Sequence, residues 1–272
     1  MNMPTLKGLN NAIFEAKSYL RYLIDAAGPH GVHSPYVYEL ITRVLPDKRS
    51  FYVFDKIERL RSDLLADNRV ITIVDLGAGS RVSSSSARRV RDIAASASQP
   101  PFSARLLFRL VQHLKPKSIL ELGTSLGITT AYLANAAANA RVISIEGAPE
   151  IASIAVENHQ RLGLSNIQVL SGAFSDKIPD AISSLGSVDF ALIDGDHRYE
   201  PTMHYFNLLM HHCNDESVLV FDDIHWSPEM NKAWEEIRSN PSVSLSLDFF
   251  DFGVVFFRKG RVKEHFVLKK PR

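Results

Sequence analysis

An acidic and glycine-containing stretch in the middle of the chain has the residue types of a ligand-binding turn. Residues 117–135 read KSILELGTSLGITTAYLAN, in which the apolar run 118–122 stops at Gly123 and a helical pattern begins after Gly127. This order indicates a strand, a tight turn and a helix. Glycines in such a turn let backbone N–H groups approach a ligand with no Cβ in the way, and the helix N-terminus supplies further donors. The turn can therefore bind a carboxylate, a phosphate or a nucleotide.

The spacing of these glycines tests one well-defined kind of nucleotide turn. The dinucleotide fingerprint Gly-x-Gly-x-x-Gly would need a glycine where this chain has Ser125, so that pattern fails. The observed pattern is acidic-x-Gly-x-x-x-Gly, from Glu121 through Gly123 to Gly127, and Glu146 ends the next apolar run. The ligand of this turn is therefore expected to differ from a dinucleotide.

Further carboxylates stand where later predicted strands end. Asp194 opens the run Asp-Gly-Asp-His-Arg-Tyr-Glu, and Asp222 and Asp223 open the run Asp-Asp-Ile-His-Trp. Ligands of an open α/β sheet gather at the carboxyl ends of its strands, so these acids are expected at one rim with Glu121 and Glu146. Carboxylates this close repel one another unless hydroxyls, amides or a cation compensate their charge. The rim therefore needs polar or cationic partners.

The elements that would position these residues alternate between strands and helices. The expected strands are 118–122, 141–146, 167–171, 188–194, 217–222, 243–250 and 253–258, and the helices between and before them include 102–114, 149–162, 178–185, 200–212 and 228–239. This alternation predicts a doubly wound, mostly parallel seven-stranded sheet with helices on both faces. The last two strands have no helix between them, so we expect an antiparallel edge strand.

The first 95 residues are predicted to form a helical extension in front of an α/β domain that occupies residues 96–272. Apolar residues recur at helical spacing over 6–27, which indicates an amphipathic helix. A second helix is expected over 34–45, because Ser and Pro stand at its first two positions, where they suit an N-cap and the first turn. We expect this extension to pack over the site as a lid.

Two features of the extension could also bind a ligand. His30 and His33 could contact a substrate or a metal ion, but hydrogen bonding within their own loop is the favoured interpretation. The second glycine-rich turn, 75–80, follows a strand-like run, yet no acid and no strand follow it at 96–101, about 20 to 25 residues further on. We therefore interpret it as a decoy of the cofactor turn, and its role stays open.

Composition excludes several classes of protein. The chain has 272 residues, 45% of them hydrophobic and 22% charged, which is ample for one large α/β domain and an extension. A net charge of +1 gives no electrostatic reason to expect nucleic acid or an anionic membrane as a partner. The single cysteine, Cys213, excludes an intrachain disulfide and a cysteine-rich zinc site, so a cytoplasmic location is expected. We find no apolar run of signal-peptide or transmembrane length.

From about residue 96 to 258 these motifs resemble class I methyltransferases, which use S-adenosylmethionine. The resemblance implies a Rossmann-like sheet and assigns Glu146 to both hydroxyls of the cofactor's ribose. It places Glu121 near the cofactor's amino-acid end, where Ser125 replaces a glycine common in the family. The positions that match cofactor-binding residues are Glu121, Gly123, Ser125, Gly127, Thr129, Glu146, Gly172, Ala173, Phe174 and Asp194. Of these, Gly172, Ala173 and Phe174 match the segment beside adenine.

The resemblance extends to a metal site and a base. Asp194, Asp222 and Asp223 match the three ligand positions of catechol-type O-methyltransferases, and an all-oxygen set suits Mg²⁺ or a similar divalent cation. The catechol branch usually has Asn and Lys where this chain has Asp223 and His197. That combination is more similar to the metal-dependent sugar and antibiotic O-methyltransferases, whose base is His. The alternative is that the aspartates only cap turns and helices.

The resemblance implies an O-methyltransferase for a small-molecule hydroxyl, with His197 as the base and divalent-metal assistance. A small-molecule acceptor is the expected partner, without nucleic acid or membrane, and a homodimer is left open. The alternative is a non-catalytic module that binds the nucleotide and uses the extension for protein interaction. The identity of the acceptor is not encoded in any motif that the sequence shows.

Overall fold

The computed structural model describes residues 6–73 and 87–270. Tertiary contacts divide the chain into two compact units. One unit runs over Asp47–Ala191 and is called the glycine-turn unit, because it contains residues 123–127. The other joins Met1–Pro46 to Leu192–Arg272 and is called the aspartate unit. The predicted boundary between an extension and a domain near residue 95 stays a prediction.

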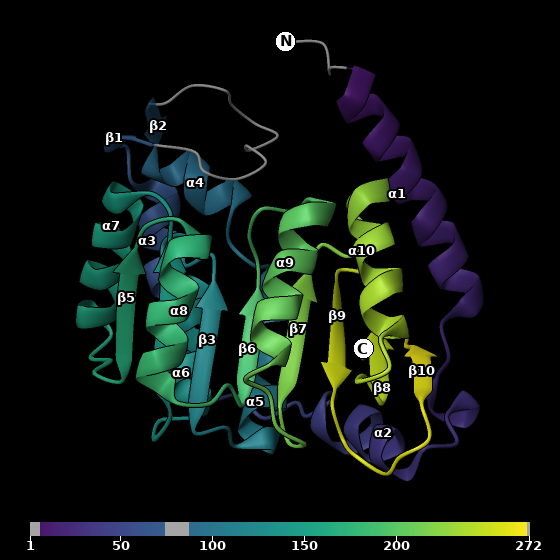
Figure 1. The fold of residues 1–272 in the computed structure, drawn as a ribbon. Helices are drawn as coiled ribbons and strands as arrows, with labels where there is room; N and C mark the ends of the chain where they lie inside the picture. The colour runs from purple at the N-terminus through teal and green to yellow at the C-terminus, as the bar shows by residue number, and fades with distance from the viewer. Residues whose placement is uncertain (1–5, 74–86, 271–272) are drawn as a thin grey trace. The chain divides into compact units, whose positions relative to one another are not determined.

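The glycine-turn unit contains three parallel strands and their connecting helices (Figure 1). Its elements in chain order are α3 (Tyr52–Ala66), β1 (Val70–Thr72), β2 (Ala87–Arg89), α4 (Val90–Ser96), α5 (Pro101–Leu114), β3 (Ser118–Leu122), α6 (Ile128–Ala136), β4 (Arg141–Glu146), α7 (Pro149–Arg161), β5 (Ile167–Ser171) and α8 (Phe174–Leu185). Strand β4 pairs with β3 on one side and with β5 on the other. All three strand ends that carry predicted cofactor residues are therefore neighbours.

A shared apolar core explains why residues 47–95 belong to this unit. The ring of Phe54 in α3 lies 4.9 Å from Phe108 in α5 and 5.5 Å from Tyr132 in α6, measured between centroids. All three side chains are buried, and Val90 and Ile93 of α4 join the same core. Helix α3, which the sequence prediction left unassigned, thus packs directly on the helix that follows the glycine turn.

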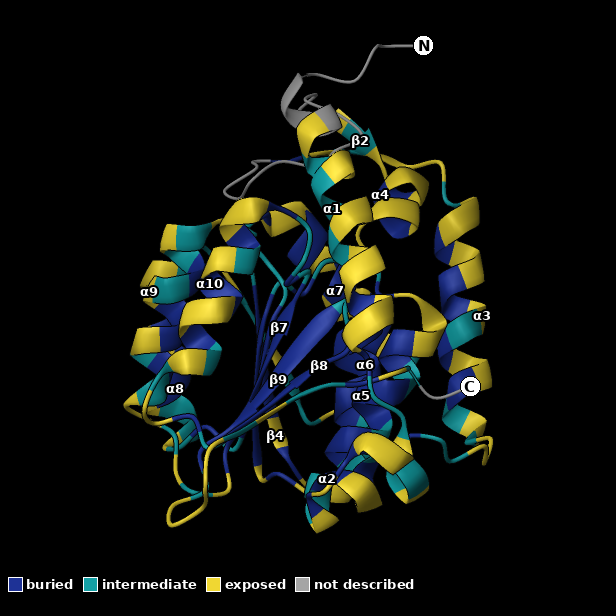
Figure 2. Cartoon of the chain, turned by 90° about the vertical axis from the view of Figure 1, so that its right-hand side faces the viewer, coloured by how far each residue is buried: buried dark blue, intermediate teal, exposed yellow. Residues whose placement is uncertain are grey.

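The aspartate unit contains the chain's ends and the later strands. Its elements are α1 (Leu6–Asp25), the short helix η1 (Pro29–Gly31), α2 (Pro35–Glu39), the π-helical turn η2 (Leu40–Val44), α9 (Tyr199–Met210), β7 (Val218–Asp222), α10 (Pro228–Ser239), β8 (Leu245–Asp248), β9 (Phe252–Phe256) and β10 (Glu264–Val267). Strands β7 and β9 are buried along their length, whereas α9 and α10 expose their outer sides (Figure 2). Strand β6 (Phe190–Ile193) includes the boundary between the two units.

Helix α1 is tied to the C-terminal segment of its own unit. The hydroxyl of Tyr22 donates a hydrogen bond to the carbonyl oxygen of Leu268 at 2.7 Å. Two residues after the helix ends, Ala27 forms an isolated parallel bridge with Leu268, and the N–H of Lys269 donates to the Ala27 carbonyl at 3.0 Å. The base of α1 is therefore fixed by backbone and side-chain contacts, while Leu20 and Ile24 remain exposed.

The strand order is β10-β8-β9-β7-β6-β3-β4-β5, an eight-stranded mixed sheet. The predicted mostly parallel, Rossmann-like α/β fold is confirmed. Two details differ: β9 runs antiparallel to both β7 and β8, and the additional strand β10 pairs in parallel with β8. The antiparallel strand β9 is therefore internal, because β7 pairs with one side of it and β8 with the other. Strand β10 lies outside β8. In the described part of the chain, no helix combines the length and apolarity needed to span a membrane.

Candidate active site

The glycine turn has a backbone conformation that explains its residue types. The φ angles of Gly123, Ser125 and Gly127 are 103°, 47° and 81°, all in the left-handed region. The N–H groups of Gly123 and Thr124 both donate to the carbonyl of Ile145 in β4, at 2.9 and 3.2 Å. This fixes the turn against the neighbouring strand. Left-handed backbone is costly for most residues and free of strain for glycine, so two of the three positions are glycine.

Glu146 holds the turn with its side chain. One carboxylate oxygen accepts the N–H of Ser125 at 2.9 Å, and the other accepts the N–H of Ala148 at 3.0 Å. The carboxylate at the end of β4 therefore lies directly against the turn after β3, as the pattern predicts. A carboxylate can accept about four hydrogen bonds, so this geometry is compatible with two additional hydroxyl donors.

Glu121 lies beneath the turn in a network of hydroxyl groups. Its side chain is fully buried, and one carboxylate oxygen accepts bonds from Thr130 of α6 and Ser144 of β4, each at 2.5 Å. Ser144 is itself 2.5 Å from the hydroxyl of Thr124. In this conformation Glu121 joins β3, β4 and α6. Its predicted contact with the cofactor's amino-acid end stays a prediction.

Two features of the turn fit a polar ligand. Within the described residues, the Ser125 hydroxyl is buried without a hydrogen-bond partner, which is costly for a polar atom unless a ligand supplies one. Thr129 is 7% exposed at the start of α6, the helix whose N-terminal end faces the turn. A ligand with amine and carboxylate groups could bind at the Ser125 hydroxyl and at Thr129. The methionine end of S-adenosylmethionine has these groups.

The predicted adenine segment is placed at the end of β5. The N–H of Gly172 donates to the main-chain carbonyl of Glu146 at 2.9 Å, which brings this segment beside the end of β4. Gly172 has φ of 143°, and an added Cβ would lie 3.0 Å from the Lys177 side chain. Ala173 caps α8 and Phe174 begins it. The structure therefore brings together the sequence-predicted cofactor residues of β3, β4 and β5.

The predicted metal and base residues all lie in the aspartate unit. The Nε2 atom of His197 is 3.6 Å from Oδ1 of Asp194 and 4.0 Å from Oδ2 of Asp223. Asp222 is 8% exposed and ends β7, and the left-handed φ of 56° at Asp223 ends the strand there. His197 is therefore brought between two predicted ligands that are far apart in the sequence.

A metal site is not preformed among the residues that the structure describes. Among residues 10–73 and 87–270, no group of three or more His, Cys, Asp or Glu side chains is arranged to hold a metal ion. Asp194, Asp222 and Asp223 have suitable oxygen chemistry, but their arrangement does not meet the geometric requirement. Magnesium binding at these aspartates therefore stays a prediction.

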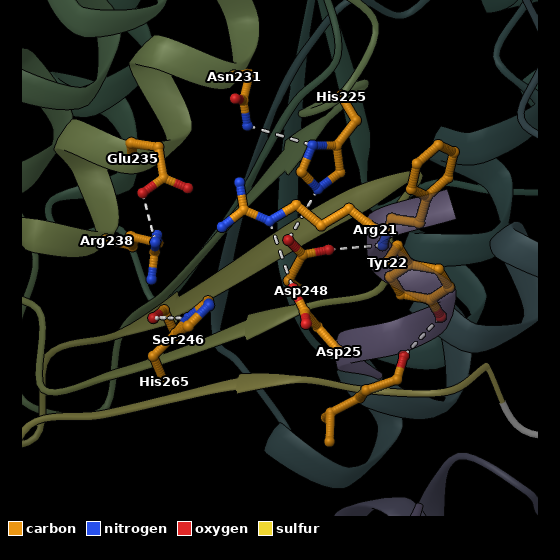
Figure 3. A network of polar contacts seen from close by, with 12 residues as sticks. Arg21, Tyr22, Asp25, His225, Asn231, Glu235, Arg238, Ser246, Asp248 and His265 are labelled. Carbon is orange, nitrogen blue, oxygen red and sulfur yellow. Dashed lines mark hydrogen bonds and ion pairs between the residues drawn. The ribbon is translucent and has the colours of Figure 1, made fainter. Parts of the chain in front are cut away.

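Polar contacts link His225 to residues of β8 and α10 (Figure 3). The Nε2 atom of His225 lies 2.9 Å from Oδ2 of Asp248, and its Nδ1 lies 3.3 Å from the side-chain amide of Asn231. The His225 ring stacks on Phe250 with centroids 5.2 Å apart, and Tyr22 of α1 contacts the same phenyl ring at 5.3 Å. His225 is thus a packed and hydrogen-bonded group.

Two further candidates from the sequence are not assigned to the site by the structure. His30 and His33 are both exposed in and after the short helix η1. Their hydrogen bonding within this loop stays a prediction. The decoy turn at 75–80 lies outside the described residues, so its role is not tested.

Two polar residues that the sequence reasoning missed contact the glycine turn. Asn158 and His159 in α7 are buried, and each contacts a main-chain carbonyl of the turn, those of Leu126 and Gly127. One sequence signal could have found Asn158: it continues the apolar spacing of Ile151 and Ala155 with a polar residue. A polar side chain at a core position of a helix needs a partner.

A mostly parallel sheet with this turn after β3 and an acid at the end of β4 defines the class I methyltransferase fold. Residues 120–224 match a family model described as a methyltransferase domain. The resemblance to methyltransferases inferred from the sequence is therefore confirmed over this stretch of the chain.

Relatives and solved structures agree with this assignment. Over 127 residues the chain is 32% identical to a catechol O-methyltransferase of Niastella koreensis, which is 46% of this chain and 57% of that protein. Over 145 residues it is 30% identical to a catechol O-methyltransferase of Mycobacterium tuberculosis, which is 53% of this chain and 62% of that protein. The chain thus spans about three fifths of the length of these relatives.

The fold is also similar to a solved O-methyltransferase. The crystal structure of the O-methyltransferase from Bacillus cereus in complex with S-adenosylhomocysteine has a TM-score of 0.54 and 19% identity. The similarity covers 77% of this chain and 92% of that one. At this identity the comparison supports the fold alone.

Proposed function

We propose that the protein transfers the methyl group of S-adenosylmethionine to a hydroxyl oxygen of a small-molecule acceptor. The observation that carries this proposal is the contact of Glu146 with Ser125, which joins the acid at the end of β4 to the glycine turn after β3. The match of residues 120–224 to a methyltransferase domain supports it. The relatives named above are O-methyltransferases, which favours oxygen as the acceptor atom.

Each part of the cofactor has a proposed partner in the chain. Glu146 would accept hydrogen bonds from the ribose hydroxyls, and the segment 172–174 would lie against adenine. The turn 123–127, with Ser125 and Thr129, would hold the methionine end. Asp194 is the remaining proposed cofactor contact.

The bound sulfonium would supply a methyl group that is already activated for displacement. The protein's task is then to orient the acceptor hydroxyl in line with that methyl group and to remove its proton. We assign the proton to Nε2 of His197. A nearby carboxylate would stabilise the resulting imidazolium, and Asp194 at 3.6 Å has the charge and distance to do so. Because the aspartates are not arranged as a metal site, no step of this scheme depends on an ion.

One alternative is a module that binds the nucleotide without catalysis. Such a module would need the glycine-turn unit and would not need a metal site. Turnover with any acceptor hydroxyl would exclude this alternative. A cytoplasmic location, a homodimer and the absence of nucleic-acid partners stay predictions for either function.

Calorimetric titration with S-adenosylhomocysteine tests the proposal. Glu146→Ala should weaken binding by at least tenfold, because a carboxylate that accepts two hydroxyl bonds is removed, at about 1.5–3 kcal/mol for charged hydrogen bonds. Glu150→Ala, which removes an exposed carboxylate four residues later, is the matched control and should bind like the wild type. Equal affinities for all three proteins would contradict the assignment of Glu146.

A further inference from the structure

The strongest unassigned feature is a pair of buried side chains behind the glycine turn. Asn158 and His159 are adjacent in the last turn of α7 and are 2% and 4% exposed. The Asn158 amide donates to the carbonyl of Leu126 at 2.9 Å, and Nε2 of His159 lies 3.1 Å from the carbonyl of Gly127. Two consecutive carbonyls of the turn are therefore bound by two consecutive side chains.

The contact between His159 and Gly127 also fixes the hydrogen on the imidazole. A carbonyl oxygen only accepts hydrogen bonds, so Nε2 of His159 must carry the proton that it donates. Burial lowers the pKa of His159 to about 4, so the ring is neutral near pH 7 and has this single tautomer. The Gly127 carbonyl also accepts the first α6 bond, from the N–H of Ala131 at 3.0 Å. The imidazole therefore bonds at the point where the turn becomes a helix.

His159 also explains why residue 127 is glycine. A Cβ on Gly127 would overlap Nε2 of His159 and lie within 3.0 Å of its Cε1. Since the φ angle of 81° is itself unfavourable for other residues, two independent constraints act on this position. The close approach of the Gly127 backbone to the His159 imidazole limits how far the turn can move toward α7.

We infer that Asn158 and His159 are positioning residues that hold the glycine turn, from behind, in the conformation that receives the cofactor's methionine end. This inference rests on the proposed function, since it assigns a purpose to a turn conformation. Glu146 bonds Ser125 of the turn, while the α7 pair bonds residues 126 and 127. The turn is thereby held by side chains from β4 and from α7.

Variants that remove or restore the hydrogen bonds test the inference. Asn158→Ala and His159→Ala should each weaken S-adenosylhomocysteine binding about tenfold, with turnover at saturating cofactor and the KM for the acceptor unchanged. His159→Gln, whose amide nitrogen can replace Nε2 as donor, should recover most of the affinity. Asn166→Ala is the matched control, because Asn166 also donates to main-chain carbonyls of this unit, but at the far end of α6, those of Ala134, Ala137 and Ala140. It should bind like the wild type.

The predicted overlap supplies a second test. Gly127→Ala should weaken binding strongly, and adding His159→Ala should recover part of the loss, because the overlap disappears while the unfavourable φ remains. Additive losses in the double variant would overturn the proposed close approach.

Hydrogen exchange separates this inference from the proposed function. Without ligand, amide exchange at residues 125–127 should be faster in Asn158→Ala and His159→Ala than in Asn166→Ala. One outcome is faster exchange in these two variants together with a wild-type protein that binds no S-adenosylhomocysteine. It would refute the proposed function and the purpose assigned to Asn158 and His159, while their contact with the turn would stay established. Unchanged exchange, or unchanged affinity in a protein that binds, would overturn the positioning role.

Discussion

The imidazole Nε2 of His225 lies 2.9 Å from Oδ2 of Asp248, which joins the loop after β7 to the end of β8. Both side chains are largely buried, at 13% and 7% exposure. The other Asp248 oxygen accepts the N–H of Phe250 at 2.8 Å, and Phe250 carries the ring on which His225 stacks. The Asp248 carboxylate therefore fixes both His225 and Phe250, the two members of the stacked pair. His225 follows Asp222 and Asp223 closely in the sequence.

Removing that carboxylate should destabilise the aspartate unit. Asp248→Ala leaves two buried donors without their acceptor, so we expect the free energy of unfolding to fall by about 2–4 kcal/mol, measured by urea denaturation. Asp251→Ala is the control, because its partner Lys270 forms a partly exposed ion pair, which is worth about 1 kcal/mol or less. An equal loss in both variants would contradict the role assigned to Asp248.

Acid should weaken folding through His159. Its pKa is about 4 in the folded protein and about 6.5 when unfolded, so the unfolded chain binds the proton more readily. The stabilising contribution is therefore complete above pH 6.5 and is lost as the pH falls toward 4. Between pH 7 and pH 5 this group should cost about 2 kcal/mol. Urea denaturation at both values should show a smaller pH effect for His159→Gln than for the wild type.

The choice of cofactor turn can be tested with two glycine variants. Gly123→Val should abolish binding of S-adenosylhomocysteine, because a branched residue is strained at a φ of 103° and intrudes on the ligand. Gly77→Val, in the decoy turn, should leave binding measurable by calorimetry. The reverse result would mean that the cofactor binds at residues 75–80.

Chelation decides whether a metal ion takes part. If Asp194, Asp222 and Asp223 bind Mg²⁺, excess chelator should stop methyl transfer and added Mg²⁺ should restore it, with cofactor affinity little changed. Full activity in chelator would show that the aspartates act without an ion.

His197 can be tested independently of the metal. His197→Ala should lower turnover by about 10² to 10⁴, the usual contribution of a positioned base, while cofactor binding survives. His204→Ala, which removes an exposed histidine of α9, should leave turnover unchanged. Wild-type turnover in the His197 variant would exclude it as the base.

The sequence by itself determined the fold class and the positions of the strands that carry the proposed cofactor residues. Apolar periodicity placed β3, β4 and β5 at their observed positions, and parallel pairing then brings Glu146 to the turn at Ser125. These contacts are predictable because they follow from strand ends that meet at one edge of a sheet. The glycine spacing likewise indicated the turn before its φ angles were known.

Only the tertiary structure decided which residues far apart in the sequence contact the glycine turn, His225 and α6. The contact of His159 with Gly127, the stack of His225 on Phe250, and the packing of α3 on α6 depend on how helices pack, which local spacing does not encode. The same holds for the arrangement of the aspartates, since a shared motif fixes residue types while side-chain geometry decides whether an ion fits. Strand β10 was not predicted because its four residues are too few for a periodic signal.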